Sequence, residues 1–363
     1  MNRYPRLLID VGKIKENTSV IRKLAERSGM SLFGVTKATS GDPEVARAML
    51  EGGASGLADS RIDNIKKMKE SGIGASMMLL RTPMMSEISD VVKYADISLN
   101  SEESVLRELS KETVKTGRSH KVIIMMEMGD LREGELRENI PSLLDLASDL
   151  EGIELHGMGM NLACFAGVVP TLDKVEIFED FVLEQEERLG LEFEMVTGGN
   201  SGNVPLLLEK PRKGRIDHLR VGEAILLGLE TVYRKPVPGT CQDAFVAEAE
   251  IIEAKVKPSV PFGRVTQNAF GETPEFEDLG DVKRIVVALG IQDTIPEDLS
   301  PLDNCIELFG GSSDHMVMHD KKNKYKAGDI VRFIPSYGAL VGLITSKYVR
   351  KVHFSGQEDD GNS

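Results

Sequence analysis

Short runs of β-forming residues alternate with amphipathic helical stretches from residue 31 to about residue 222, and this alternation constrains the fold more than any other feature. The helical stretches repeat apolar residues at spacings of three and four, and they often stop at glycine. Eight strand-helix units predict a (β/α)8 TIM barrel. The β-like runs are LFGVTK (32–37), GLADS (56–60), SMMLLR (76–81), ADISL (95–99), KVIIMMEM (121–128), LHGMGMN (155–161), FEMVTGG (193–199) and HLRVG (218–222).

The segments that flank these units predict the rest of the architecture. Residues 13–28 are expected to form a helix that enters the first barrel strand, and residues 3–11 an extra strand outside the barrel. After Gly228 the chain becomes rich in proline and glycine, and a series of β runs separated by turn signals follows. The α/β barrel is therefore expected to precede a mostly β C-terminal domain. The expected divisions are a barrel domain (1–235), a β domain (236–355) and a polar, disordered tail (356–363).

Composition excludes several classes of protein. Among 363 residues, 41% are hydrophobic and 28% charged, and no apolar run approaches the roughly 20 residues that span a bilayer. A formal charge of −14 argues against a nucleic-acid partner, because phosphate binding needs concentrated Lys and Arg. The three cysteines are odd in number and widely spaced, and the N-terminus has no secretory pattern. A cytoplasmic enzyme with reduced thiols is expected.

Lys37 closes the first β run, and barrel enzymes place their active sites at the C-terminal ends of the strands. Desolvation at a barrel mouth would lower the pKa of this amine and make it a usable nucleophile. A lysine at a strand end more commonly reaches out to solvent, so its position alone does not decide between the two.

Two glycine-rich motifs follow the last two β runs. TGGNSGN (197–203) offers a hydroxyl and closely approaching backbone amides, and HLRVGEAILLG (218–228) adds an arginine and a glycine. In a barrel, the loops after the seventh and eighth strands commonly bind phosphate. A glycine-rich turn without a ligand is the alternative for each motif taken singly.

Together these motifs resemble the alanine racemase-like family of fold-type III pyridoxal enzymes, and within it the alanine/ornithine racemase subgroup. The resemblance covers nearly the whole chain, and its specificity comes from the order of the motifs. They are GVTKATSGDPEVA around Lys37, MGDLREG (128–134), HGMGMNLACF (156–165), TGGNSGN, HLRVGEAILLG and GGSSDHMVM (310–318).

The resemblance implies a pyridoxal 5'-phosphate-dependent racemase in which Lys37 holds the cofactor and acts as one proton-transfer base. Arg220 matches the arginine that faces the pyridine nitrogen. Since an arginine is not a proton acceptor, such a partner leaves the ring nitrogen unprotonated and favours return of a proton to the α-carbon over transamination. Fold-type III decarboxylases have a carboxylate at this position.

Other matches imply further contacts with cofactor and substrate. An ordinary strand tyrosine, a structural histidine and a solvated charged loop are the respective alternatives for Tyr337, His156 and Arg132. Ser201, the Gly222–Glu223 backbone and Tyr337 match the family's phosphate cradle, and Asn200 precedes Ser201 as in related sequences. His156 matches a histidine beside the cofactor ring. Arg132 matches an arginine near the substrate carboxylate.

The sequence departs from the family at the second base. Alanine racemases supply a tyrosine from the partner subunit's β domain, and here the matching run ALGIQDTIP has Ile291 at that place. Two-base racemisation still needs a proton donor on the opposite face of the substrate. The candidates for this proton donor are Asp293, Asp314 and His315, and the sequence does not rank them. Ser313 and Asp314 fall in the segment that matches the partner-chain loop at the substrate carboxylate.

The sequence therefore predicts a homodimer with shared active sites that interconverts L- and D-amino acids. Ornithine or another basic amino acid is the expected substrate, with weak support from the acidic residues Glu133, Asp293 and Asp314. Alanine or a broad specificity is the alternative. Other possibilities are a non-catalytic cofactor carrier, against which the β domain counts, and a D-amino-acid aldolase or dehydratase. The last would need a metal, and no convincing His and Cys spacing is present, so no metal site is expected.

Overall fold

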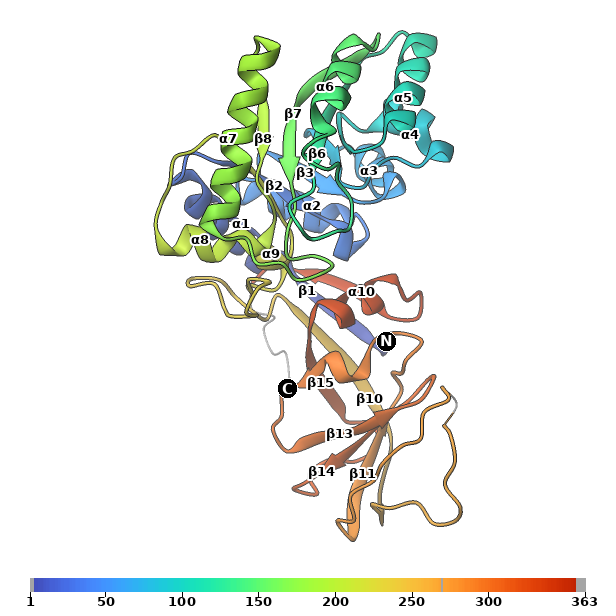
Figure 1. The fold of residues 1–363 in the computed structure, drawn as a ribbon. Coiled ribbons are helices and arrows are strands. Elements are labelled where there is room, and N and C mark those ends of the chain that lie inside the picture. Colours follow the sequence, from blue (N-terminus) through green and yellow to red (C-terminus); the bar gives the residue numbers. More distant parts are fainter. Residues whose placement is uncertain (1–2, 269, 357–363) are drawn as a thin grey trace. The chain divides into compact units, whose positions relative to one another are not determined.

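The computed structural model describes residues 3–268 and 270–356, which form two compact units. One unit runs from Val11 to Gln242, and the other joins the N-terminal segment up to Asp10 to the chain from Asp243 onward. Figure 1 shows the first unit in blue to yellow-green and most of the second in yellow to red.

The first unit contains the predicted closed barrel of parallel strands, with each strand paired to the next along the chain and β9 paired back to β2. Its strands are short and almost wholly buried, which explains the continuous apolar runs in the sequence. Within the described residues they are β2 (Ser31–Val35), β3 (Gly56–Asp59), β4 (Met77–Leu79), β5 (Ile97–Asn100), β6 (His120–Met126), β7 (Ile153–Met160), β8 (Met195–Thr197) and β9 (His218–Val221).

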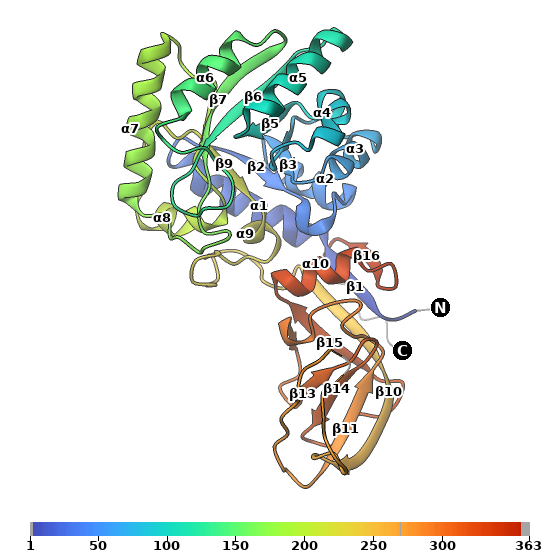
Figure 2. The same cartoon turned by 45° about the vertical axis from the view of Figure 1, so that its right-hand side comes forward.

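Helices surround these strands, as both ribbon views show (Figures 1 and 2). Local sequence sets their ends: the Asp42 carboxylate caps the helix that begins at Pro43, and Gly117 and Gly190 end two others in the left-handed conformation. The helices are α1 (Val11–Glu26), α2 (Pro43–Glu51), α3 (Ile62–Glu70), α4 (Ile88–Tyr94), α5 (Glu103–Thr116), α6 (Ile140–Asp149), α7 (Leu172–Leu189), α8 (Val204–Glu209) and α9 (Glu223–Leu226), with 3-10 turns η1 (Lys37–Thr39), η2 (Met85–Glu87) and η3 (Ser201–Asn203).

Side chains fill the barrel, so it is a packed core rather than a channel. Flexible methionines occupy several of the inner positions, where they fill irregular gaps. The buried cluster consists of Phe33, Val35, Ala58, Met78, Ile97, Leu99, Ile123 and Met125.

The second unit is a mostly antiparallel β sheet with one longer helix, α10 (Tyr337–Thr345). The N-terminal strand β1 (Arg6–Asp10) pairs antiparallel with the long β10 (Phe245–Pro258) and parallel with β16 (Arg350–Phe354). The other elements are β11 (Asp281–Val287), η4 (Pro296–Asp298), β12 (Leu299–Pro301), β13 (Ile306–Gly311), β14 (Met316–Asp320) and β15 (Ile330–Pro335), and the strand order is β12-β15-β10-β11-β14-β13.

The observed division differs from the expected one at two places. The chain leaves the barrel unit at Gln242 rather than near residue 235, because the segment after Gly228 folds back on itself: Val237 N donates to Gly228 O at 2.8 Å, and Asn17 of α1 bonds the backbone of Cys241. The extra N-terminal strand lies outside the barrel, but it belongs to the β unit. The predicted tail lies outside the described residues from residue 357 on.

Helices in the described part of the chain are all too short or too polar to cross a membrane. Within the described residues, Cys164, Cys241 and Cys305 form no disulfide bond.

Candidate active site at the carboxyl end of the barrel

Lys37 lies immediately beyond β2, at the carboxyl end of the barrel, and its side chain is exposed. Buried Thr36 precedes it, and its Oγ1 donates to Asp59 Oδ2 at 2.8 Å. Burial raises the pKa of the Asp59 carboxyl, while Thr36 and the nearby charge of Lys37 oppose that rise. A sharp turn with positive φ at Ser40 and Gly41 then ends η1. Lys37 therefore lies on a short turn, and the hydrogen bond from Thr36 to the buried Asp59 carboxyl group holds the start of this turn in place.

Arg220 is the second key residue, and it is almost fully buried on β9. Nη1 donates to Thr197 Oγ1 on β8, and Nη2 donates to the carbonyl of Met160 at the end of β7 at 2.9 Å. Within residues 3–268 and 270–356, the guanidinium forms no ion pair with a carboxylate. Burial lowers the pKa of Arg220 to about 10, which still leaves it charged at neutral pH. A buried cation held only by neutral acceptors is costly unless a further acceptor completes its shell.

The loops after β8 and β9 meet at Ser201. Its Oγ accepts from the backbone N of Ala224, in the first turn of α9, at 3.1 Å. Space for a side chain is tight close by: a Cβ at Gly202 would lie 3.0 Å from Ala163 Cβ, and one at Gly222 would lie 3.1 Å from Val35 Cβ. Thr231 Oγ1, 3.2 Å from that Gly202 position, is buried and has no hydrogen-bond partner in the described residues. Hydroxyls and close backbone thus converge on one small region.

Asn200 and Glu223 were predicted at the phosphate, but their side chains bond to other groups of the protein. Asn200 accepts from Gly202 N at 2.6 Å and donates to Asn161 Oδ1 at 3.0 Å and to the Leu162 carbonyl at 2.7 Å, so it ties the loops after β7 and β8 together. The Glu223 carboxylate is paired with Arg234, and burial raises its pKa. Glu223 can therefore offer a ligand its backbone rather than its side chain.

Arg132 lies exposed in the loop after β6, where it pairs with Glu133 at 3.2 Å. This loop is fastened by buried Asp130, whose carboxylate accepts from the backbone N of Phe165 at 2.8 Å in the loop after β7. After burial and Cys164, the charges of Arg132 and Glu133 act on the pKa of Arg220 in opposite directions.

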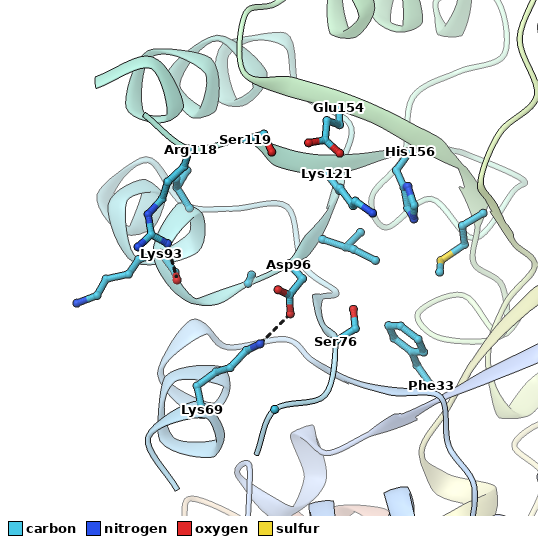
Figure 3. Close-up of a pocket in the computed structure, with 15 residues that line it drawn as sticks. Phe33, Lys69, Ser76, Lys93, Asp96, Arg118, Ser119, Lys121, Glu154 and His156 are labelled. Atoms are coloured by element: carbon cyan, nitrogen blue, oxygen red, sulfur yellow. Dashed lines mark hydrogen bonds and ion pairs between the residues drawn. The ribbon is translucent and has the colours of Figure 1, made fainter. Parts of the chain in front are cut away.

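His156 does not join this group, which corrects its expected place beside a cofactor ring. It lies in the first half of β7, and parallel barrel strands all run the same way, so it belongs to the amino-end side of the barrel. There it lines a cavity of about 670 Å³ with residues that precede or open other strands, such as Asp96 and Lys121. Figure 3 shows His156 and Lys121 pointing into this cavity. The residue that follows the carboxyl end of β7 is Asn161.

Sequence reasoning missed Thr197, Asn161 and Thr231. Asn161 closes its β run, so the strand-end rule that singled out Lys37 could have found it, and Thr197 is the last residue of the observed strand β8, two residues before its predicted run ends. No sequence pattern indicated Thr231, because its position next to Gly202 depends on how the loop folds.

In the β unit, the two motifs that could supply a second base form one local structure. Ile291 N donates to Ser312 O and Gln292 N donates to Ser313 O, both at 2.9 Å. Ser313, Asp314 and His315 are exposed there.

Asp293 differs from these residues, because it is 4% exposed and accepts from Ser346 Oγ at 2.6 Å. Its carboxylate is thus engaged inside the β unit, and this enclosure counts against Asp293 as the second base. Tyr337 begins α10 in this unit.

A closed parallel barrel whose carboxyl end carries an exposed lysine, a buried arginine and two glycine-rich loops defines a class of enzyme that holds a phosphate-bearing ligand beside an amine. A family model described as "Alanine racemase, N-terminal domain" matches residues 9–230, and the chain belongs to this family. The resemblance inferred from the motifs is confirmed, and with it an amino-acid racemase that depends on pyridoxal phosphate.

Curated relatives and solved structures agree with this assignment. Ornithine racemase of Acetoanaerobium sticklandii is 40% identical over 355 residues, which cover 96% of this chain and 99% of that protein. Lysine racemase of Thermotoga maritima is 38% identical over 351 residues, covering 96% and 98%. The alanine racemase structure from Streptomyces lavendulae has a TM-score of 0.76 at 18% identity and covers 98% and 99% of the two chains, a likeness that confirms the fold.

Proposed function

We propose that this enzyme interconverts the L- and D-forms of a basic amino acid, with ornithine or lysine as substrate. Support for the substrate comes from two relatives of nearly equal length, named ornithine racemase and lysine racemase, at 40% and 38% identity. Glu133, at the carboxyl end of the barrel beside Arg132, is an acidic group of the kind that would pair with a distal ammonium.

The observation that carries the proposal is the buried Arg220 guanidinium without a carboxylate partner. A guanidinium has five N–H donors and no acceptor, so it suits a ring nitrogen that presents a lone pair. It cannot give that nitrogen a proton at neutral pH, since its pKa stays near 10. This environment supports proton return to the α-carbon rather than transamination.

The residues present fit pyridoxal phosphate, and two observations support this: neighbouring atoms approach Gly202 closely, and the buried Thr231 hydroxyl has no hydrogen-bond partner among the described residues. The Ser201 hydroxyl and the backbone from Gly222 to Ala224 would hold the phosphate, with Tyr337 as a further proposed contact. When bound, the cofactor supplies an aldehyde that links to amino groups and a conjugated ring that makes the α-proton acidic.

Lys37 then moves the proton at one face of the substrate's α-carbon, and its exposed amine at the strand end has the reach to do so. For the opposite face, we propose Asp314 or His315 from a partner subunit in a homodimer, because both are exposed and Ile291 offers no proton. Arg132 and Ser313 would orient the substrate carboxylate. A cytoplasmic location, expected from an N-terminus without a secretory pattern, completes the proposal.

Three alternatives remain open to test. Alanine is the first, since the family model carries that name. A cofactor carrier without catalysis is the second. An aldolase is the third, because a D-threonine aldolase structure from Filomicrobium marinum shares the fold with a TM-score of 0.72 at 15% identity. Among the described residues, no group of three or more His, Cys, Asp or Glu side chains is arranged to hold a metal.

A screen of individual L-amino acids for loss of optical rotation tests the proposal. The holoenzyme should racemise ornithine or lysine faster than alanine, and the Lys37→Ala variant should racemise none of them. Faster turnover of alanine would overturn the substrate assignment, and release of an aldehyde from a β-hydroxy amino acid would support the aldolase.

A further inference from the structure

Three side chains form a buried row inside the barrel. Thr197 and His218 are each 0% exposed and Arg220 is 3% exposed. Thr197 pairs with His218 in the β8–β9 register, and its Oγ1 lies 2.9 Å from His218 Nδ1. The same Oγ1 receives the hydrogen bond from Arg220 Nη1. One hydroxyl therefore joins the histidine to the arginine.

The protons of this row can be assigned by counting. Arginine can only donate, so Thr197 Oγ1 must accept from Arg220. The hydroxyl has one proton of its own, and among the described residues His218 Nδ1 is the one acceptor within its reach, so we assign this bond as donated by Thr197. The His218 ring is then neutral and carries its hydrogen on Nε2.

The surroundings of His218 favour this neutral form. Burial, followed by the charge of Arg220 and then by His156, holds the pKa of His218 well below 6.5. The edge-on ring of Phe33, 4.6 Å away between centroids, is its aromatic neighbour, and Nε2 has no hydrogen-bond partner in the described residues. A protonated ring would bring a second positive charge next to the buried Arg220 guanidinium, and it would remove the acceptor for the Thr197 hydroxyl's own proton.

We propose that Thr197 and His218 are positioning residues that fix the Arg220 guanidinium through a neutral hydroxyl and a neutral imidazole, so that its whole positive charge faces the cofactor ring nitrogen. This rests on the proposed function. A carboxylate in their place would hold the arginine equally firmly, but it would cancel the charge that keeps a proton off the ring nitrogen. The neutral pair provides geometry without that cancellation.

The first test needs no activity. Nitrogen-15 NMR of the histidine-labelled apoenzyme should show His218 with its hydrogen on Nε2 and no titration between about pH 5 and 8, with the signal assigned by its loss in His218→Asn. A hydrogen on Nδ1, or titration near pH 6.5, would overturn the proton assignment.

The second test uses Thr197→Val, which keeps the shape but removes the hydroxyl, and Thr197→Ser, which restores it. Thr197→Val should lower kcat about 10- to 100-fold with little change in KM, shift the visible absorption band of the bound cofactor, and change the acid limb of the pH profile. Thr197→Ser should recover most of each effect. If Thr197→Val misfolds, His218→Leu takes its place, and His218→Asn, whose amide oxygen can accept from Thr197, should recover part of the loss.

His120 supplies a matched control, because it is another buried histidine bonded to a hydroxyl, Ser98 Oγ at 2.8 Å, and the two lie on β6 and β5, which do not pair with β8 or β9. His120→Asn should leave the cofactor band and the pH profile unchanged. Unchanged kcat and spectrum in a folded Thr197→Val enzyme would overturn the positioning role. Absence of racemisation in the wild type would instead contradict the proposed function, and the NMR result would stand apart from it.

Discussion

Replacing Arg220 by methionine should abolish most activity while leaving the apoenzyme about as stable as the wild type. The shift in the pKa of Arg220 from 12.5 to about 10 corresponds to about 3 kcal/mol of burial cost at neutral pH, since one pKa unit is about 1.4 kcal/mol. Because a cation with a lowered pKa is disfavoured in the folded state, this cost is present at every pH below about 10. Methionine removes it.

The substitution also removes the donor from Thr197 Oγ1 and from the Met160 carbonyl, at about 1–2 kcal/mol each. The two effects nearly cancel, so denaturant unfolding of the apoenzyme at pH 7 should show a change within about 1 kcal/mol. Racemisation should fall about 10²- to 10³-fold, as for loss of one preorganised donor.

Arg215 provides the comparison, since it is mostly buried but paired with Glu186 at 2.5 Å and Asp217 at 3.0 Å. Arg215→Met leaves those carboxylates unpaired and should destabilise the apoenzyme by about 3 kcal/mol or more. An Arg220→Met apoenzyme destabilised as much as Arg215→Met would refute the view that Arg220 lacks a compensating partner.

Other expectations concern the phosphate, the second base and acid stability. Ser201→Ala should weaken cofactor binding about 10- to 100-fold, measured by titrating the apoenzyme, because one hydrogen bond to a charged group is worth about 1.5–3 kcal/mol. Of Asp314→Ala and His315→Ala, one should lose α-deuterium uptake in heavy water from a single enantiomer of ornithine; normal exchange of both enantiomers in both variants would exclude the pair. Burial lowers the pKa of His120 to about 4, so the unfolded state gains a proton first as the pH falls from 6.5. The free energy of unfolding should therefore drop by about 3 kcal/mol between pH 6.5 and 4 on account of this residue, and His120→Asn should remove that part of the loss.

The barrel could be predicted because its strands are buried on both faces. Runs such as the one around Met77 are apolar throughout, and capping residues such as Asp42 separate them from the helices. The same regularity placed Lys37 and Arg220 at strand ends, where the structure has them.

The remaining features depend on contacts between distant residues. Arg6 pairs with Glu248, and nothing in the local sequence around β1 reveals that partner. Asp293 was chosen for its chemistry, but its enclosure by Ser346 arises only when α10 packs in the β unit. His156 lies near the start of its β run, and β7 is long enough to hold its start and its end far apart, so a match by motif alone put His156 at the wrong end of the barrel.

The central claim is that the cofactor is bound through Lys37 at the carboxyl end of the barrel. Borohydride reduction of the holoenzyme followed by peptide mapping tests it most directly, because the reduced link to the lysine is stable and adds a fixed mass. The account predicts one modified peptide containing Lys37, and no modification of the Lys37→Ala variant. A label on another lysine, or a reconstituted protein that takes up no cofactor, would contradict it.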